Sequence, residues 1–140
     1  MERALYDELY RTEEGHWWFR GRRAVIRSVL KKIPQSRNQT AFDIGCGTGL
    51  NTEMLATLGF SAEGLESSDD AIDFARLRAP NIVVRKGSFP EGMVEEKYYN
   101  LITLFDVLEH IEDDAGALRL VHSLLQPGGF VLLTVPAFSF

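Results

Sequence analysis

The sequence predicts an α/β fold, in which an open, mostly parallel sheet carries helices on both faces. From about residue 38, short apolar segments alternate with longer helical patterns, which is the alternation expected of β-α-β units. The segments that end at Phe105 and at Val135 are almost continuously apolar, as strands buried on both faces are. No internal repeat interrupts this alternation, so we expect all the strands to join one sheet.

Each element follows from local signals. Five strands are predicted, at 40–44, 61–66, 81–86, 99–105 and 130–135. Helices are predicted at about 48–58, 69–79 and 113–125, and a turn at 126–129. Gly59 is a suitable C-terminal stop for the first of these helices, Ser67 or Ser68 can cap the second, and Pro80 ends it. Two further helical patterns precede the first strand, at about 2–12 and 18–32.

Length and charge divide the chain into two parts. Its 140 residues suffice for one domain with a small appendage. Residues 1–37 hold nine Lys and Arg against five Asp and Glu, whereas residues 38–140 hold six against fifteen. We therefore expect a basic N-terminal helical arm or lid, 1–37, before an acidic ligand-binding domain, 38–140. The acidic domain argues against a nucleic-acid partner, because affinity for nucleic acids comes largely from neutralising phosphates.

Composition also bears on location. No apolar run approaches the roughly 20 residues that span a bilayer, and the charged N-terminus lacks the apolar core of a signal peptide. Cys46 is the single cysteine, so no internal disulfide forms, and a cytoplasmic location is expected. No metal site is expected, although Glu13, Glu14 and His16 lie close together in the sequence.

A glycine-rich segment follows the first predicted strand. Gly45, Gly47 and Gly49 alternate with other residues between a strand and a helix, which lets a ligand lie against the backbone. The spacing is not the G-x-G-x-x-G of dinucleotide-binding loops. Asp43 borders the loop, where its charge would repel a pyrophosphate but suits a ligand that carries an ammonium and a sulfonium. Cys46, inside the loop, is interpreted as a small filler and not as a nucleophile.

Glu66 is the second element of the predicted site. It ends the second strand, at about the spacing from the glycine loop at which an acidic residue accepts hydrogen bonds from ribose hydroxyls. An acidic residue at a strand end is, by itself, usually only solvated. Together with the loop, however, Glu66 points to a positively charged, phosphate-free nucleoside as the ligand.

Three segments together resemble the ordered motifs of class I S-adenosylmethionine-dependent methyltransferases: FDIGCGTG with Glu66, LFDVLEHIED at 104–113 and LLQPGGFVLLTVP at 124–136. The chain is most similar to the bacterial small-molecule branch that includes the ubiquinone-biosynthesis methylases. The resemblance implies a Rossmann-like, doubly wound sheet with strand order 3-2-1-4-5. Strands six and seven of that fold do not follow here, so the domain is expected to be incomplete, and its exposed fifth strand could mediate homo-oligomer formation.

The resemblance implies S-adenosylmethionine as the cofactor and assigns residues to it. Gly45, Gly47 and their neighbours would hold the methionine moiety, Asp43 would order the loop and the amino group, and Glu66 would bind the ribose. The expected cofactor-binding residues are Asp43, Gly45, Cys46, Gly47, Gly49, Glu66, Ser67, Ser88, Phe89, Phe105, Asp106 and Arg23.

Residues after the second, third and fourth strands complete this expected site. Ser67 would lie beside the adenine, and Ser88 and Phe89 would flank it. Family members often have Asp where Ser88 stands, and a serine hydroxyl can still accept a hydrogen bond from the adenine amino group. Phe105 and Asp106 would border the methionine portion and the transferred methyl.

Two basic positions have further expected roles, at the cofactor carboxylate and beside the acceptor. Arg23 would pair with the carboxylate of the cofactor, as the arginine before the first strand does in the quinone methylases. His110 could act as a general base for an acceptor near neutral pH, or it could fix the loop through hydrogen bonds to backbone. Methyl transfer from a sulfonium is an in-line displacement that depends mainly on positioning, so a catalytic base is optional.

The N-terminal segment 13–23 resembles the leader of uncharacterised methyltransferases of sugar, lipid or cell-surface pathways. Its aromatic residues 17–19 could cover the cofactor as a lid or simply pack onto the sheet. The basic residues between Arg20 and Arg37 could attract an anionic acceptor.

Three functions remain open from the sequence. The first is a methyltransferase that acts on a small molecule, or its cofactor-binding fragment. The second is a non-catalytic cofactor-binding or assembly subunit. The third is another enzyme with a Rossmann-like fold, such as an NAD-dependent dehydrogenase or an aminopropyltransferase.

Overall fold

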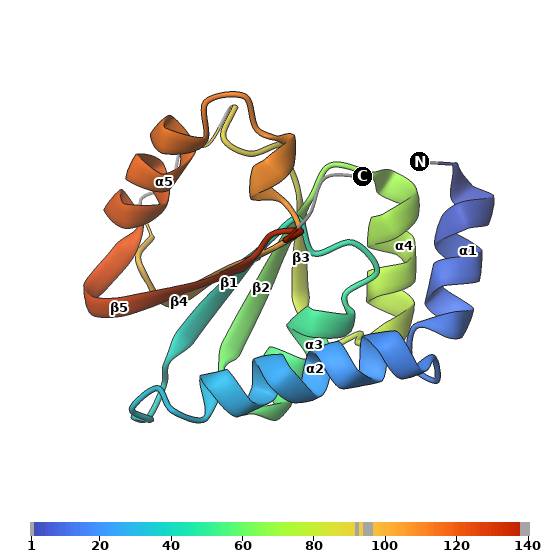
Figure 1. Ribbon diagram of the computed structural model, residues 1–140, viewed down its shortest axis with the longest axis horizontal. Helices are drawn as coiled ribbons and strands as arrows, with labels where there is room; N and C mark the ends of the chain where they lie inside the picture. Colours follow the sequence, from blue (N-terminus) through green and yellow to red (C-terminus); the bar gives the residue numbers. More distant parts are fainter. Residues whose placement is uncertain (1, 92, 94–96, 138–140) are drawn as a thin grey trace.

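A computed structural model describes residues 2–91, 93 and 97–137, and its five strands form one parallel sheet in the order β3-β2-β1-β4-β5 (Figure 1). This order confirms the predicted one. The strands are β1 (Thr40–Ile44), β2 (Ser61–Glu66), β3 (Val83–Lys86), β4 (Tyr99–Phe105) and β5 (Leu125–Thr134). The helices are α1 (Arg3–Thr12), α2 (Trp17–Leu30), α3 (Leu50–Thr57), α4 (Asp69–Arg78), the 3-10 helix η1 (Leu108–His110) and α5 (Asp114–Ser123).

Helices cover both faces of the sheet, as the sequence predicted. Figure 1 shows α5 on one side and α2 with α3 on the other. On the α2–α3 side, Ile26 and Leu30 of α2 pack with Met54 and Leu55 of α3 against inner residues such as Ala41. On the α5 side, the apolar cluster contains Phe42, Ile44, Leu65, Tyr99, Ile102, Leu104, Val121 and Leu124. Alternate residues of β1 therefore serve the two cores, which is the pattern of a buried parallel strand.

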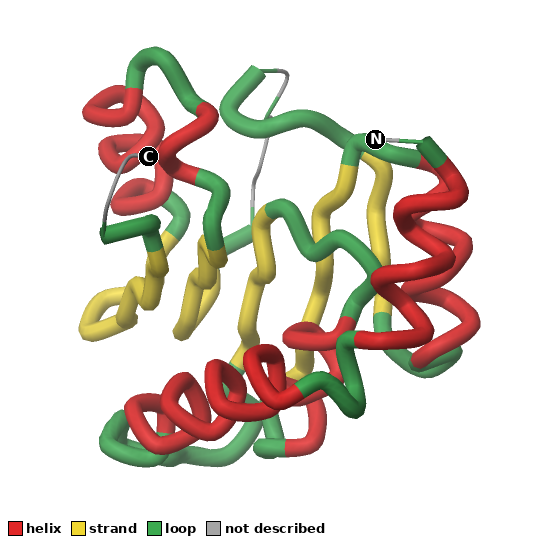
Figure 2. Tube along the Cα trace, turned by 45° about the vertical axis from the view of Figure 1, so that its right-hand side comes forward, coloured by secondary structure: helices red, strands yellow, loops and turns green. Residues whose placement is uncertain are grey.

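The N-terminal arm packs closely on the rest of the chain. Helix α1 lies beside α4 in both views (Figures 1 and 2), where the rings of Tyr10 and Phe74 lie 5.2 Å apart. Arg3 binds Asp70 of α4 at 2.8 Å. Helix α2 runs beneath the strands in Figure 2, with Ile26 and Leu30 buried. The predicted division of the chain into an arm, 1–37, and a domain, 38–140, stays a prediction.

Some predicted boundaries were wrong. The segment 126–129, predicted as a turn, lies within β5, where the pairing with β4 shifts register between Tyr99 and Leu101. Gly128 there has a φ of 77°, so the Pro-Gly-Gly segment forms an irregularity in the strand. Helix α3 begins at Leu50 and not at 48, because the left-handed Gly49, with a φ of 80°, still belongs to the loop.

Strand β5 forms one edge of the sheet and pairs only with β4 among the described strands. Phe130, Val131 and Val135 are exposed there. Self-association through this edge stays a prediction. No helix in the described part of the chain combines the length and the apolar character needed to cross a membrane.

Candidate functional site

The three glycines of the loop after β1 allow close packing at two positions and leave open space at the third. Gly45, Gly47 and Gly49 all have positive φ angles, of 70°, 55° and 80°. A Cβ on Gly45 would lie 2.6 Å from a methyl of Val107, and one on Gly49 would lie 2.9 Å from the Cβ of Ala75, whereas one on Gly47 would meet nothing within 4 Å. Gly45 and Gly49 are thus required by packing, and Gly47 leaves room for a ligand to approach the backbone.

Glu66 at the end of β2 is bound to this loop through its carboxylate. Its Oε2 accepts a hydrogen bond from the Gly47 amide at 2.9 Å, and its Oε1 accepts from the amides of Ser67 and Ser68 at 2.9 and 3.0 Å. A carboxylate offers about four acceptor positions, so capacity remains for a ligand hydroxyl. Glu66 is therefore held in a fixed orientation, unlike a solvated residue at a strand end.

A cavity of about 300 Å³ adjoins Glu66, and we call it the Glu66 cavity. This volume is within the range of small-molecule sites. Its polar and apolar walls come from the ends of β1, β2 and β3 and from the segment after β4. The lining residues are Ile44, Gly45, Leu65, Glu66, Ser67, Gly87, Ser88, Phe89, Glu91 and Val107.

A second cavity, of about 150 Å³, lies where the N-terminal arm meets the loop, and we call it the arm cavity. Leu9, Glu13, Phe19, Arg22 and Arg23 form its arm side. The other side is formed by the loop and the start of α3, through Cys46, Gly47, Thr48, Leu50 and Asn51. Both cavities adjoin the glycine loop, the Glu66 cavity at Gly45 and the arm cavity at Cys46 and Gly47.

Asp43, at the end of β1, lies buried beside the loop and connects α3 to β4 through hydrogen bonds. Its carboxylate is 2% exposed and accepts hydrogen bonds from the hydroxyls of Thr52 at 2.7 Å and Thr103 at 2.8 Å. Burial raises the pKa of Asp43 to about 6, although these two hydrogen bonds oppose the rise. The structure thus places Asp43 where it can order the loop; it lines neither cavity, so its predicted contact with the cofactor amino group stays a prediction.

Cys46 is also buried in the loop. Burial is the main cause that raises the pKa of its thiol, and the negative charges of Asp43 and Glu66 raise it further. A thiol with a raised pKa is a poor nucleophile at neutral pH. These properties fit the interpretation of Cys46 as a small filler.

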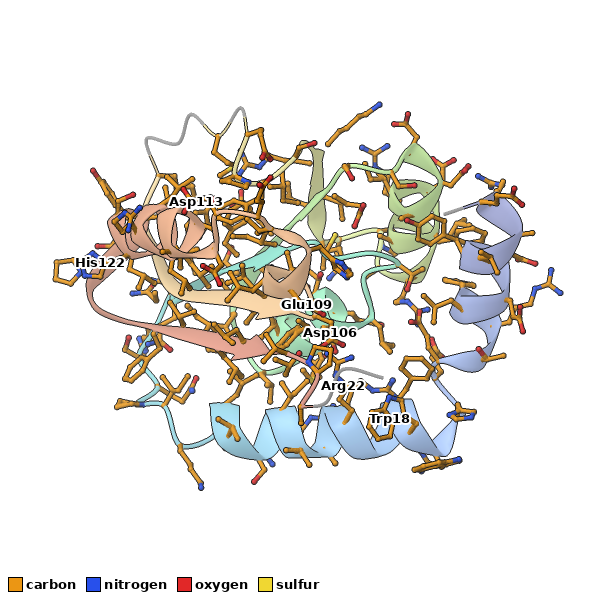
Figure 3. All side chains as sticks on the ribbon, turned by 45° about the horizontal axis from the view of Figure 1, so that its top comes forward. Trp18, Arg22, Asp106, Glu109, Asp113 and His122 are labelled. Carbon is orange, nitrogen blue, oxygen red and sulfur yellow. The ribbon has the colours of Figure 1, made fainter. Side chains whose placement is uncertain are left out.

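Asp106 lies at the end of β4, and its partner is an arginine of the arm. Its Oδ2 binds Arg22 Nη1 at 2.7 Å, and Arg22 Nη2 donates to the Thr134 hydroxyl at 2.7 Å. Figure 3 shows Arg22 reaching from α2 toward Asp106. Asp106 has a φ of 55°, a left-handed conformation held by hydrogen bonds between its amide and Thr134.

The structure brings most of the predicted cofactor-binding residues to the two cavities. Those that line the Glu66 cavity are Gly45, Glu66, Ser67, Ser88 and Phe89, and those that line the arm cavity are Cys46, Gly47 and Arg23. Asp43, Gly49, Phe105 and Asp106 line neither. Asp43 and Gly49 nevertheless shape the loop, and Asp106 binds Arg22, which lines the arm cavity.

His110 is not placed beside either cavity. Its side chain is 79% exposed in η1, and Nε2 lies 3.9 Å from a carboxylate oxygen of Glu109. The suggested roles of His110, as a base or in fixing the loop, both stay predictions. His122, on α5, is exposed and points outward at the edge of the molecule in Figure 3.

The aromatic segment of the arm divides its side chains between several environments. His16 caps α2, accepting at Nδ1 from the Trp18 amide at 3.3 Å. Trp17 and Trp18 are 74% and 56% exposed, whereas Phe19 lines the arm cavity. Only Phe19 of the three adjacent aromatics is thus placed to cover a ligand in that cavity.

Sequence reasoning missed four residues of the site. Arg22 binds Asp106 and lines the arm cavity, and Glu13, Thr48 and Arg78 form a buried cluster beside it. Glu13 was considered only as a metal ligand, yet no metal-binding group of three or more His, Cys, Asp or Glu occurs in the described part of the chain. For Glu13 the sequence signal was the density of charged residues around the aromatic segment; no signal linked it to Thr48 or Arg78.

A parallel 3-2-1-4-5 sheet, with a glycine loop after β1 and an amide-bound carboxylate after β2, defines a Rossmann-like domain that binds a nucleoside cofactor. The sequence model of a family described as "Methyltransferase domain" matches residues 18–140. This chain therefore belongs to that family, the class I S-adenosylmethionine-dependent methyltransferases, and S-adenosylmethionine is its cofactor class.

Known proteins similar to this chain are longer. It is 32% identical over 133 residues to a ubiquinone biosynthesis O-methyltransferase of Nitrosomonas europaea, covering 85% of this chain and 57% of the relative. The S-adenosylmethionine-bound structure of CalS10, an amino pentose methyltransferase from Micromonospora echinaspora, matches with a TM-score of 0.74 and 25% identity, covering 96% of this chain and 57% of that one. The chain spans about half the length of the curated relatives it matches.

Fold similarity extends along nearly the whole chain. Streptomyces venezuelae DesVI matches with a TM-score of 0.75 at 21% identity, covering 99% of this chain and 61% of that one. At this identity the match concerns the fold alone, and it agrees with the sheet order observed here.

Proposed function

We propose that this chain binds S-adenosylmethionine along its glycine loop and serves in methyl transfer to a small molecule. The observation that carries the proposal is Glu66, held by the amides of Gly47, Ser67 and Ser68 beside a cavity of about 300 Å³. A fixed carboxylate at the end of β2 with one acceptor position left is suited to accept a hydrogen bond from a hydroxyl of a ribose. Ser67, Ser88 and Phe89 would then surround the adenine.

The arm cavity fits the amino-acid end of the same cofactor. Gly47 presents its backbone there, and Arg22 and Arg23 bring two positive charges for a carboxylate. Both guanidinium groups already have partners: Arg23 donates to the carbonyls of Glu13 and Glu14, and Arg22 binds Asp106. Arg23 and Arg22 are both proposed to bind the carboxylate of the cofactor, since both line the same cavity.

The chemistry asks little of the protein beyond placement. When bound, S-adenosylmethionine supplies a methyl group already activated on a sulfonium. The loop and Glu66 would hold the nucleoside, and the arm would exclude water from the sulfonium side. Orientation alone can supply roughly 7–11 kcal/mol toward such a displacement. The proton of the acceptor can then leave to water or to a side chain, so the mechanism does not require His110.

The acceptor is proposed to be a small molecule, and an anionic one is the candidate that the charge of the arm favours. The basic residues of the arm support an anionic acceptor, and the relatives named above are a ubiquinone biosynthesis O-methyltransferase and an amino pentose methyltransferase. The proposal also includes a cytoplasmic location, supported by the single cysteine, and no nucleic-acid partner, supported by the acidic residues of 38–140.

Calorimetric titration with S-adenosylhomocysteine tests the proposal. We expect binding to the wild-type chain and a Kd about tenfold or more higher for Glu66→Gln, because an amide cannot accept the same set of charge-assisted hydrogen bonds. Glu112→Gln is the matched control, because Glu112 is an exposed carboxylate outside both cavities. Micromolar binding of NAD without binding of S-adenosylhomocysteine would contradict the proposal.

A further inference from the structure

A buried carboxylate joins the N-terminal arm to the glycine loop. Glu13, which follows the last residue of α1, is 4% exposed. Its Oε1 accepts hydrogen bonds from the hydroxyl of Thr48 and from Nη2 of Arg78, the latter at 2.5 Å. Thr48 belongs to the loop and Arg78 ends α4, so one oxygen atom connects three separate parts of the chain. We call Glu13, Thr48 and Arg78 the Glu13 cluster.

Arg78 makes this cluster a junction and not a simple pair. Its side chain is 2% exposed, and its Nε donates to the carbonyl of Thr48 at 3.1 Å. Its Nη1 binds Glu14 at 2.5 Å, and its guanidinium lies 4.5 Å from the centre of the Tyr10 ring. Arg78 therefore contacts the loop, the end of α1 and the segment between α1 and α2 at once.

The α2 side of the junction is held by backbone hydrogen bonds. Arg23 Nη1 donates to the carbonyl of Glu13 at 2.9 Å, and its Nη2 donates to that of Glu14 at 3.2 Å. The position of Glu13 thus also fixes Arg23, which lines the arm cavity. A displaced Glu13 would carry this arginine away from the loop.

The arm cavity depends on this junction. Five of its ten lining residues belong to the arm and five to the loop and α3. The remainder of α1 is anchored elsewhere, through Arg3 to Asp70 and Tyr10 to Phe74. Loss of the Glu13 carboxylate would therefore loosen the segment between α1 and α2 over the loop without detaching α1 from α4.

Burying Glu13 carries a cost in stability. Desolvation is the largest influence on it and raises its pKa, against the lowering effects of Thr48 and Arg78. Replacing a buried ion pair by packed apolar residues is often neutral or stabilising, so such a pair is weak evidence for a purely stabilising role. A role in holding a specific arrangement accounts for it better.

We propose that Glu13 and Arg78 are positioning residues, which hold the arm closed over the glycine loop and so complete the cavity for the amino-acid end of the cofactor. This inference rests on the proposed function, because it assigns the arm cavity to one part of the S-adenosylmethionine molecule. The nucleoside part would lie in the Glu66 cavity, whose lining residues are not among the hydrogen-bond or ion-pair partners described above for Glu13, Thr48 and Arg78. The two parts of the cofactor should therefore respond differently when the cluster is broken.

Two ligands distinguish binding in the arm cavity from binding in the Glu66 cavity. S-adenosylhomocysteine has both the nucleoside and the amino-acid end, whereas 5′-methylthioadenosine lacks the amino-acid end. For Glu13→Gln we expect the Kd of S-adenosylhomocysteine to rise about tenfold, while the Kd of 5′-methylthioadenosine changes by less than about twofold. Glu8→Gln, an exposed carboxylate on α1, is the matched control and should change neither value.

A second pair of variants tests the loop side and guards against misfolding of Glu13→Gln. Thr48→Val keeps the branched shape but removes the hydroxyl that donates to Glu13, and it should weaken S-adenosylhomocysteine selectively. Thr48→Ser keeps the hydroxyl and should restore the wild-type affinity. Circular dichroism and the unfolding midpoint establish that each variant is folded.

The outcomes are distinct. Equal losses for both ligands would mean that the cluster only stabilises the fold, and unchanged affinity for S-adenosylhomocysteine in Glu13→Gln and Thr48→Val would also overturn the inference. Binding of neither ligand by the wild-type chain would overturn the proposed function, and the inference with it. Wild-type binding of both ligands with no selective effect in the variants would overturn the inference alone.

Discussion

At the scale of single residues, protonation of the Asp43 carboxyl makes the stability of the fold depend on pH. Its pKa is about 6 in the folded chain against an ordinary value of 3.8. Between these values the folded chain keeps a proton that the unfolded chain has lost. The stability due to this group is therefore greatest at low pH and falls as the pH rises through 6, by about 3 kcal/mol in total.

The variant Asp43→Asn should remove this dependence. An amide can still form hydrogen bonds with the hydroxyls of Thr52 and Thr103, which are free to rotate. Between pH 7 and pH 5 we expect the free energy of unfolding of the wild type to rise by about 1 kcal/mol relative to the variant. Urea titrations at both pH values measure this difference, and parallel changes in the two proteins would contradict the assignment.

The partners of the Arg22 and Arg23 side chains could not be predicted from the sequence. Adjacent residues on a helix point in directions about 100° apart, so their sequence context is nearly the same while their partners differ. Arg23 was singled out, yet Arg22 forms the ion pair with Asp106. The glycine loop and Glu66 were identified correctly as neighbours, because parallel strands bring their carboxyl ends to one edge of the sheet.

At the scale of elements, α5 depends on its first residues. Asp113 caps it, with Oδ1 accepting from the Gly116 amide at 2.9 Å, and Figure 3 shows Asp113 at the start of the helix. A Cβ on Gly116 would lie 2.0 Å from the other carboxylate oxygen of Asp113. The capping conformation therefore needs a glycine at this position.

Replacing the cap should weaken the α5 side of the core. Asp113→Ala leaves the first amides of α5 without this acceptor, and we expect the free energy of unfolding to fall by about 1 kcal/mol. Chemical denaturation measures it, with Glu112→Ala as the control one residue earlier. Similar losses in both variants would show that the effect is one of general surface charge and not of capping.

Strand β5 shows why an element boundary can be misplaced. Pro127, Gly128 and Gly129 are turn-forming residues, and the sequence predicted a turn there. The same residues also suit an irregular strand, since Gly128 provides the positive φ of 77°. Which of the two occurs depends on whether β4 offers a partner strand, and local sequence does not contain that information.

At the scale of the whole molecule, the sheet and the two helices of the arm could be predicted, whereas the packing of the arm on the rest of the chain could not. Strand and helix periodicity, with the motifs at 43–49, 104–113 and 124–136, sufficed for the sheet and for the helices on its two faces. The contact between Glu13 and Arg78 joins positions far apart in the sequence; Arg78 belongs to no motif, and the segment 13–23 does not indicate a partner for Glu13. Such contacts arise from the packing of α1 on α4, which periodicity does not encode.

The burial of Cys46 gives the chain a built-in reporter. As the sole thiol, with a raised pKa and 8% exposure at the wall of the arm cavity, it should react with a disulfide reagent only when that wall opens. We expect saturating S-adenosylhomocysteine to slow this reaction several-fold, with the denatured chain as the reference for full reactivity. Equal rates with and without ligand would contradict this. The reaction rate of this one native thiol would then report how often the loop opens, without an engineered probe.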